Sequence, residues 1–81
     1  MSHTYILYSP TLNKYYVGHT CDELEERLRR HLSNHNGFTA KAKDWKIAFS
    51  RAFQAQKEAQ AFEKKIKSWK SRTMIQKLIN A

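Results

Sequence analysis

The chain contains only one cysteine, two glycines and one proline among its 81 residues. Cys21 has no second thiol with which to form an internal disulfide, so we expect a reducing compartment, namely the cytoplasm. The few glycines and the single proline leave no segment with the composition of a linker. The sequence also lacks an apolar run of about 18 residues, which excludes a membrane-spanning helix, and its first residues lack the features of a signal peptide.

The length limits the architecture to a single domain, which we place over residues 1–81. A domain of this size buries only about 60% of the surface that its unfolded chain exposes, so we expect low stability. Four Phe, four Tyr and two Trp contribute large apolar side chains that help to compensate.

Basic residues are abundant: 15 Lys and Arg stand against 7 Asp and Glu, a formal net charge of +8. A positive field of this strength on a small protein steers it toward a polyanion. Nucleic acid is the favoured partner, because its phosphates pair with Lys and Arg and release counterions. A membrane surface is the weaker candidate, since the sequence lacks the broad apolar helix faces of interfacial anchors. A basic surface without any polyanionic partner is the remaining alternative.

The first part of the chain has the pattern of a β-hairpin. Residues 4–8 are rich in aromatic and β-branched types that suit a strand, and residues 9–13 have turn chemistry. Residues 14–17 resume as a second strand, which we expect Gly18 to end. Strand parity places Tyr5 and Leu7 on one face and Ile6 on the other, and it separates Tyr16 from Tyr15 in the same way.

A helix is expected to begin near Asp22, which has the spacing of a capping box with Glu25. Leu24, Leu28 and Leu32 recur every four residues and predict its buried stripe. Residues 33–37 are polar and read as the exit of the helix, followed by a loop through residue 44.

The second half of the chain predicts one strand and two helices. Trp45, Ile47 and Phe49 alternate with smaller or polar residues, which is the period of a strand. An apolar seam then predicts a helix over residues 55–69, and Ser71 caps a last helix whose inner face includes Ile75. The order β-β-α-β-α-α indicates the α+β class.

Three polar residues lie at the borders of the apolar helix stripes. Arg27 and His31 are one turn apart, where an Arg holds a phosphate and a His moves a proton near neutral pH. Taken alone, this helix favours the simpler interpretation of a solvated Arg with a half-buried His. Glu63 has two readings: its carboxylate suits a hard divalent cation, but it is also spaced to form an i,i+4 ion pair with Lys67.

The order and spacing of these residues resemble the GIY-YIG nuclease domain, and the resemblance covers nearly the whole chain. The matching positions are Tyr5 in a degenerate first motif, Tyr16-Val17-Gly18 in the second, Arg27 and His31 in an Arg-x-x-x-His element, and the helical Glu63. Segments such as Tyr15-Tyr16-Val17-Gly18-His19-Thr20 are similar to small stand-alone bacterial members. The resemblance implies an antiparallel three-stranded sheet flanked by helices, with one catalytic surface.

The resemblance also implies hydrolysis of a phosphodiester bond with one divalent ion, Mg²⁺ or Mn²⁺, bound by Glu63. Arg27 would stabilise the charge of the transition state, and Tyr16 or the neighbouring Tyr5 would position or deprotonate the attacking water. His31 would take or relay the proton. His19 is an accessory candidate, because excision-repair members carry a lysine at its position.

We therefore expect a DNA endonuclease, with structure-selective cleavage in DNA repair or processing as one form of that function. The alternatives are an inactive nucleic-acid-binding module of the same fold and a protein-interaction domain that uses Trp69. We expect a monomer or homodimer and no small-molecule cofactor. Contacts with backbone phosphates are assigned to the following residues: Lys41, Lys43, Lys64, Lys65, Lys67, Lys70 and Arg72.

Overall fold

The computed structural model describes residues 1–32 and 42–81, with the side chain of His31 outside the described part. The elements are β1 (Ser2–Ser9), β2 (Lys14–Thr20), α1 (Leu24–Leu32), β3 (Lys46–Phe53), α2 (Gln56–Trp69) and α3 (Arg72–Ile79). The predicted α+β class and the order β-β-α-β-α-α are confirmed. Residues 33–41, where the sequence predicts the helix exit and most of the following loop, lie outside the described residues.

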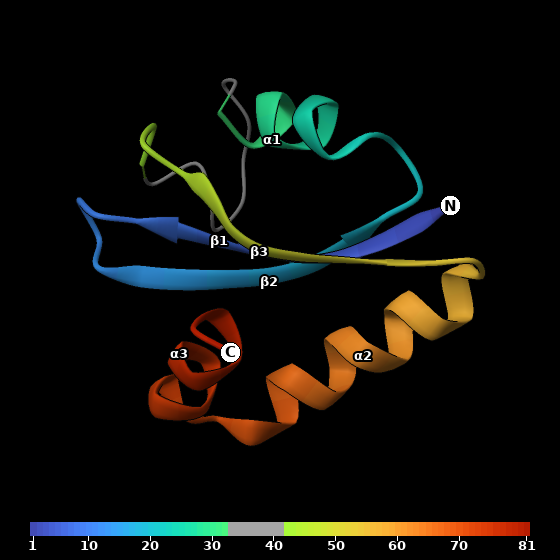
Figure 1. The fold of residues 1–81 in the computed structure, drawn as a ribbon. Coiled ribbons are helices and arrows are strands. Elements are labelled where there is room, and N and C mark those ends of the chain that lie inside the picture. Colours follow the sequence, from blue (N-terminus) through green and yellow to red (C-terminus); the bar gives the residue numbers. More distant parts are fainter. Residues whose placement is uncertain (33–41) are drawn as a thin grey trace.

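The sheet has the order β2-β1-β3, and both pairs of neighbouring strands are antiparallel. Figure 1 shows α1 on one face of this sheet and α2 and α3 on the other. The prediction that Gly18 ends the second strand is wrong, since β2 continues to Thr20 and Gly18 pairs with Tyr5. A glycine inside a strand is tolerated where another group approaches closely, and Tyr5 is that group.

Each face of the sheet carries its own apolar core. On the α1 side Tyr5, Leu7 and Trp45 are buried against the leucines of α1. On the α2 side Ile6 and Ile66 are buried together with partly buried aromatic residues. The predicted strand parity is confirmed, because Tyr16 packs on the α1 side and Tyr15 on the α2 side.

The third strand does not keep strict alternation along its length. Leu7 pairs with Ile47 whereas Ile6 pairs with Phe49, so Ala48 is an extra residue in β3. A bulge of this kind moves the following side chains to the opposite face. Phe49 therefore packs on the α2 side, where its ring centroid lies 6.4 Å from that of Phe62. The sequence pattern of Trp45, Ile47 and Phe49 placed all three in one period and did not reveal this shift.

The helix starts were predicted with mixed success. Ser71 caps α3 as expected, because its hydroxyl accepts a hydrogen bond from the Met74 amide at 3.3 Å. The capping box at Asp22 is wrong, since α1 begins two residues later. The backbone amide of Asp22 donates instead to the Thr20 hydroxyl at 3.0 Å, and its carboxylate pairs with Arg30 at 3.1 Å. The second helix begins at Gln56, one residue after the predicted start.

The turn between β1 and β2 is held by two distant residues. The Asp44 carboxylate accepts hydrogen bonds from the hydroxyls of Ser9 and Thr11, each at 2.6 Å. These bonds lower the pKa of Asp44 from its ordinary value of 3.8 to about 2. Arg72 donates to the backbone oxygen of Asn13 at 2.6 Å, which ties the start of α3 to the same turn.

None of the helices in the described part of the chain is long and apolar enough to cross a membrane.

Candidate active site

Tyr5 lies in the middle strand of the sheet, directly opposite Gly18 of the edge strand β2. Its side chain is buried, with 1% of its surface exposed. A Cβ atom at position 18 would lie 2.7 Å from the Tyr5 hydroxyl oxygen and 2.8 Å from Cζ, far inside van der Waals contact. The glycine therefore leaves the space in which the phenol of Tyr5 reaches the edge of the sheet.

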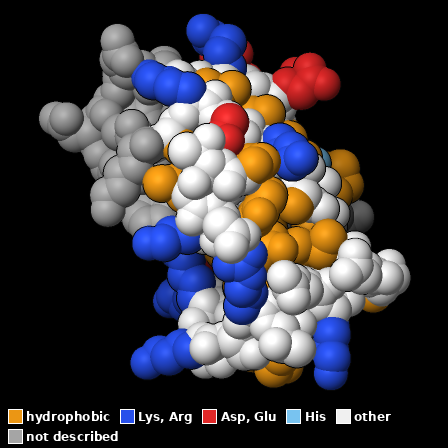
Figure 2. All heavy atoms as spheres, turned by 90° about the vertical axis from the view of Figure 1, so that its left-hand side faces the viewer, with side chains coloured by type: hydrophobic (Ala, Val, Ile, Leu, Met, Phe, Trp, Pro, Cys, Tyr) orange, Lys and Arg blue, Asp and Glu red, His pale blue; other side chains and the backbone are white. Residues whose placement is uncertain are grey.

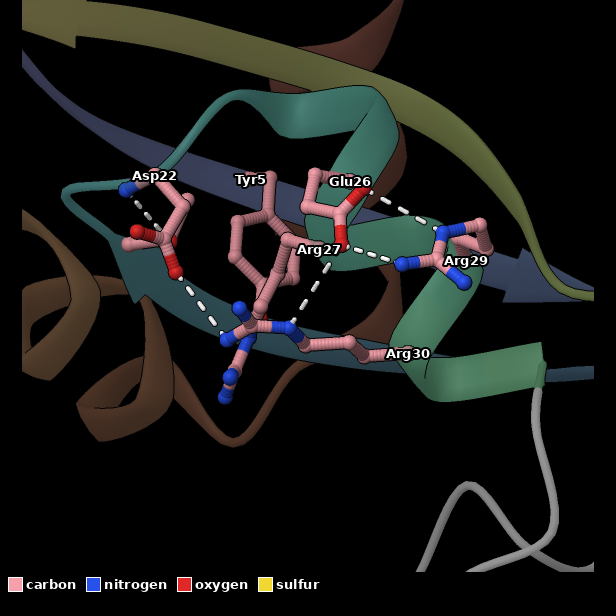
Figure 3. A network of polar contacts seen from close by, with 7 residues as sticks. Tyr5, Asp22, Glu26, Arg27, Arg29 and Arg30 are labelled. Atoms are coloured by element: carbon pink, nitrogen blue, oxygen red, sulfur yellow. Dashed lines mark hydrogen bonds and ion pairs between the residues drawn. The ribbon is translucent and has the colours of Figure 1, made fainter.

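Arg27 of α1 approaches the same phenol. Its Nε donates a hydrogen bond to the Tyr5 hydroxyl oxygen at 3.2 Å (Figure 3). Burial raises the pKa of Tyr5, and the hydrogen bond and charge of Arg27 oppose this shift only in part. The same bond raises the pKa of Arg27. At neutral pH the pair therefore consists of a neutral phenol and a cation.

The other cations of α1 are paired with acids. Arg29 donates to Glu26 at 2.5 Å, and Arg30 donates to Asp22 at 3.1 Å (Figure 3). Among the residues that the structure describes, Arg27 forms no ion pair with a carboxylate. Of the three arginines, Arg27 is thus the one whose charge is available to an anionic ligand at the sheet.

Glu63 of α2 lies on the opposite side of the sheet, in a cluster with His19 and Lys67. Its carboxylate is close to both, since Oε1 contacts His19 Nδ1 and Oε2 accepts a hydrogen bond from Lys67 Nζ at 2.5 Å. Only 14% of the Glu63 side chain is exposed. Burial by itself would raise the pKa of Glu63, but the hydrogen bonds and charges of Lys67 and His19 outweigh it and lower the pKa. Glu63 is therefore ionised at neutral pH.

The two clusters come within electrostatic reach of each other around the edge of β2. The charge of Glu63 contributes to raising the pKa of Tyr5 across the sheet, and Tyr16 interacts electrostatically with both Tyr5 and Arg27. Among the strands of residues 1–32 and 42–81, β2 lies at the edge of the sheet, so none of them flanks its outer side. Tyr5, Tyr16 and Arg27 thus lie together on the α1 side, and Glu63 lies on the α2 side, from where its charge still reaches Tyr5.

The structure describes the other residues that were proposed from the sequence in less detail. His31 belongs to α1, one turn after Arg27, but its side chain lies outside the described part. Lys41 is also outside the described residues. Lys43 donates to the Leu32 carbonyl at 3.3 Å. Arg72 lies over the Tyr15 ring, 5.2 Å from its centroid, in addition to its contact with the hairpin turn.

Two features that position the candidate site residues were not predicted from the sequence. One is the space that Gly18 provides for Tyr5, which follows only from the register of the hairpin. The other is Thr4, which is fully buried and whose hydroxyl donates to the Ala59 carbonyl at 2.7 Å. Ala59 is one turn before Glu63 in α2, so this bond fixes the height of Glu63 on the sheet. A strand threonine gives no sequence signal for such a contact.

The donor set around Glu63 fits a metal ion that needs few protein ligands. In the described ranges, no group of three His, Cys, Asp or Glu side chains is close enough to hold a metal. Mg²⁺ is commonly bound by one or two carboxylates, with water and substrate phosphate oxygens as its other ligands. Glu63, as an ionised and partly buried hard oxygen donor, meets that requirement once Lys67 releases one of its oxygens.

Fold and site together define a small α+β domain with a tyrosine–arginine pair on one side of the sheet and an ionised carboxylate on the other. The family model of the GIY-YIG catalytic domain matches residues 1–78. The chain therefore belongs to the GIY-YIG family of the nuclease superfamily, whose substrates are nucleic acids. No curated protein and no solved structure matches the chain.

Proposed function

We propose that the protein is a metal-dependent endonuclease that hydrolyses phosphodiester bonds in DNA. The observation that supports this most directly is the separation of charge at the β2 edge. Arg27, without a carboxylate partner in the described part of the chain, lies on one side, and the ionised Glu63 lies on the other. Such an edge offers a cation to the scissile phosphate and a hard oxygen to a divalent ion.

The residues have different tasks in this proposal. Glu63 holds one Mg²⁺ or Mn²⁺ ion, which when bound polarises the phosphate and favours deprotonation of water. Arg27 donates to the phosphate oxygens and stabilises the charge that develops on them. Tyr5 positions Arg27, because a buried phenol with a raised pKa is a poor base. Tyr16, which is half-buried beside it, orients the attacking water.

Proton transfer falls to the histidines. His19 contacts the Glu63 carboxylate through Nδ1, which leaves Nε2 as the atom that exchanges a proton with water or with the leaving group. His31 has the same capacity and is one turn from Arg27 in α1. We assign the role of accessory proton carrier to His19 and retain His31 as the alternative.

DNA binding rests on the positive charge of the chain, a net +8, and on the lysines of α2. Contacts of this kind go to the phosphate backbone and carry no sequence information. We therefore propose cleavage that depends on DNA structure rather than sequence, as is useful in DNA repair or processing. Binding should weaken steeply with salt, since each phosphate contact releases counterions.

A second candidate function is a nucleic-acid-binding module that does not cleave. The contact between Lys67 and Glu63 favours it, because an ammonium group takes one of the carboxylate oxygens that a metal requires. The two candidates differ in whether Mg²⁺ displaces this ion pair. The Lys67 end of this pair is exposed, so the pair contributes about 1 kcal/mol and a divalent ion with a bound phosphate can displace it.

The deciding experiment measures cleavage of labelled single-stranded, duplex and branched DNA with Mg²⁺, with Mn²⁺ and with chelator. We expect cleavage that requires the metal and that is lost in Glu63→Gln, which keeps the size of the side chain. Glu58→Gln serves as the matched control, since Glu58 is an exposed acid in the first turn of the same helix. Metal-independent cleavage, or equal cleavage by both variants, would contradict the proposal. Salt-sensitive binding without any cleavage would establish the second candidate.

A further inference from the structure

An open groove lies beside the candidate active site, between β2 and the junction of α2 with α3. Its volume is about 510 Å³, within the range of about 300–1,000 Å³ that is usual for small-ligand sites. The partly exposed Tyr15 and Ile75 provide its apolar floor, and the buried Val17 and Ile66 complete the lining. The groove is thus large enough for one nucleotide and offers a surface on which a flat base can pack.

The rim of the groove is cationic. Lys14, Lys67, Lys70 and Arg72 line it, and no Asp or Glu does so in the part of the chain that the structure describes. Figure 2 shows this end of the molecule, where hydrophobic side chains are exposed in a band with Lys and Arg side chains at its borders. An apolar floor with positive borders is complementary to a base with its attached phosphates.

The groove is continuous with the candidate active site. Lys67 belongs to both, because it lines the groove and its ammonium group donates to Glu63 Oε2 at 2.5 Å. Tyr16 borders the groove as part of β2, although its side chain packs on the α1 side. A nucleotide in the groove would therefore adjoin a phosphate that, in the proposed function, binds beside Lys67 and Glu63.

We propose that this groove receives one unpaired nucleotide next to the scissile phosphate. The inference rests on the proposed nuclease function for the identity of its ligand, and it specifies the substrate class as DNA in which a duplex adjoins a single strand. A base in a duplex leaves its stack only at a cost of a few kcal/mol, whereas an unpaired base is already available. Cations elsewhere on the surface serve both kinds of DNA, whereas the apolar floor and the cations of its rim contact only the unpaired nucleotide.

The test compares the affinity of the protein for a blunt duplex and for the same duplex with a short unpaired extension, measured by fluorescence anisotropy in chelator. Stacking of one base on an aromatic or apolar surface contributes about 1–3 kcal/mol, so we expect about tenfold tighter binding of the extended duplex. Lys70→Glu at the rim and Ile75→Asn in the floor should abolish this preference. Lys57→Glu, at the other end of α2, should weaken binding of both duplexes by the same factor.

Lys70 is exposed at the end of α2, so its variant is expected to fold even if the Ile75 variant does not. Equal affinity of the wild-type protein for both duplexes would overturn the proposal. So would a preference that survives in Lys70→Glu and in folded Ile75→Asn, which would leave the groove to a different ligand such as an apolar segment of a protein. Because the assay contains no metal, it is independent of catalysis. Preference without cleavage would refute only the nuclease function, and cleavage without preference would refute only this inference.

Discussion

The two faces of the sheet carry polar clusters of opposite kind. On the α1 face the buried phenol of Tyr5 accepts a hydrogen bond from Arg27, and the pair has a net positive charge. On the α2 face Glu63 is ionised and lies between His19 and Lys67. If Arg27 and Glu63 shared a face, they would form an ion pair and neutralise each other. The sheet separates them, so each charge is available to a different part of a substrate–metal complex at the β2 edge.

Removal of the cation on the α1 face should have the largest effect on catalysis. We expect Arg27→Met to lower the rate of cleavage by about 10²–10³, because it removes charge stabilisation in the transition state. The concentration of Mg²⁺ at half-maximal activity should stay the same, since the proposed metal ligand Glu63 lies on the other face. Single-turnover cleavage over a range of Mg²⁺ concentrations measures both quantities, with Arg29→Met as the control on the same helix. A changed metal requirement in Arg27→Met would show that the two faces are not independent.

Filling the space beside Gly18 should lower both the stability and the cleavage activity of the protein. In Gly18→Ala the new Cβ atom would overlap the Tyr5 phenol, and overpacking of this kind costs about 1–3 kcal/mol. The displaced phenol would also lose its bond to Arg27, so the cleavage rate should fall beyond what instability explains. Thermal unfolding and cleavage at a temperature where the variant is folded give the two effects. A fully stable and active Gly18→Ala variant would contradict the account of Tyr5 given above.

The hydrogen bond that holds α2 against β1 can be removed by a substitution at Thr4. Thr4→Val keeps the shape of the side chain but removes the hydrogen bond to the Ala59 carbonyl, for an expected loss of about 1 kcal/mol in the free energy of unfolding. Because Ala59 is one turn before Glu63, we also expect weaker metal binding, with the phosphate contribution of Arg27 unchanged. Chemical denaturation and the Mg²⁺ dependence of cleavage measure these quantities. Thr4→Ser, which keeps the hydroxyl, should restore metal binding.

Removal of the ion pair between Lys67 and Glu63 should have a small effect in the opposite direction, towards a lower Mg²⁺ requirement. Lys67→Met removes the cation that competes with a metal for Glu63, and an exposed i,i+4 pair contributes a few tenths of a kcal/mol. We expect about a twofold decrease in the Mg²⁺ concentration needed for half-maximal cleavage. Lys64→Met controls for the loss of one positive charge on the same helix. An increased metal requirement would mean that Lys67 positions Glu63 rather than competing for it.

Lowering the pH should affect the stability that Asp44 contributes and the metal binding of Glu63 as their lowered pKa values predict. Asp44 has its pKa lowered from 3.8 to about 2, so its contribution to stability is present above pH 3.8 and is lost as the pH falls toward 2. Glu63 also has a lowered pKa, so metal binding should persist below its ordinary value of 4.5. Asp44→Asn is expected to be less stable at neutral pH and to lose less stability between pH 4 and 2. Denaturation at several pH values tests this, and an unchanged acid profile would contradict it.

The helices and strands were predictable because their signals are local. Alternation of residue types predicted the hairpin, and apolar residues at steps of three and four predicted the helices. The resemblance to the GIY-YIG family identified Tyr16, Arg27 and Glu63 as candidates. The errors arose where non-local pairing decides. The bulge at Ala48 is defined by the partner strand β1, and the true start of α1 depends on the contacts of Asp22 with Thr20 and Arg30.

The sequence by itself determined the class of the fold, the positive charge of the chain, the parity of the hairpin tyrosines and its membership of a nuclease family. Only the tertiary structure decided that Arg27 and Glu63 lie on opposite faces, that Gly18 leaves space for the Tyr5 phenol, and that a groove lies beside Lys67. The reason is physical. Periodicity reports which face of its own element a side chain occupies, but the distance between two elements depends on strand order, register and helix packing, which involve residues far apart in the chain.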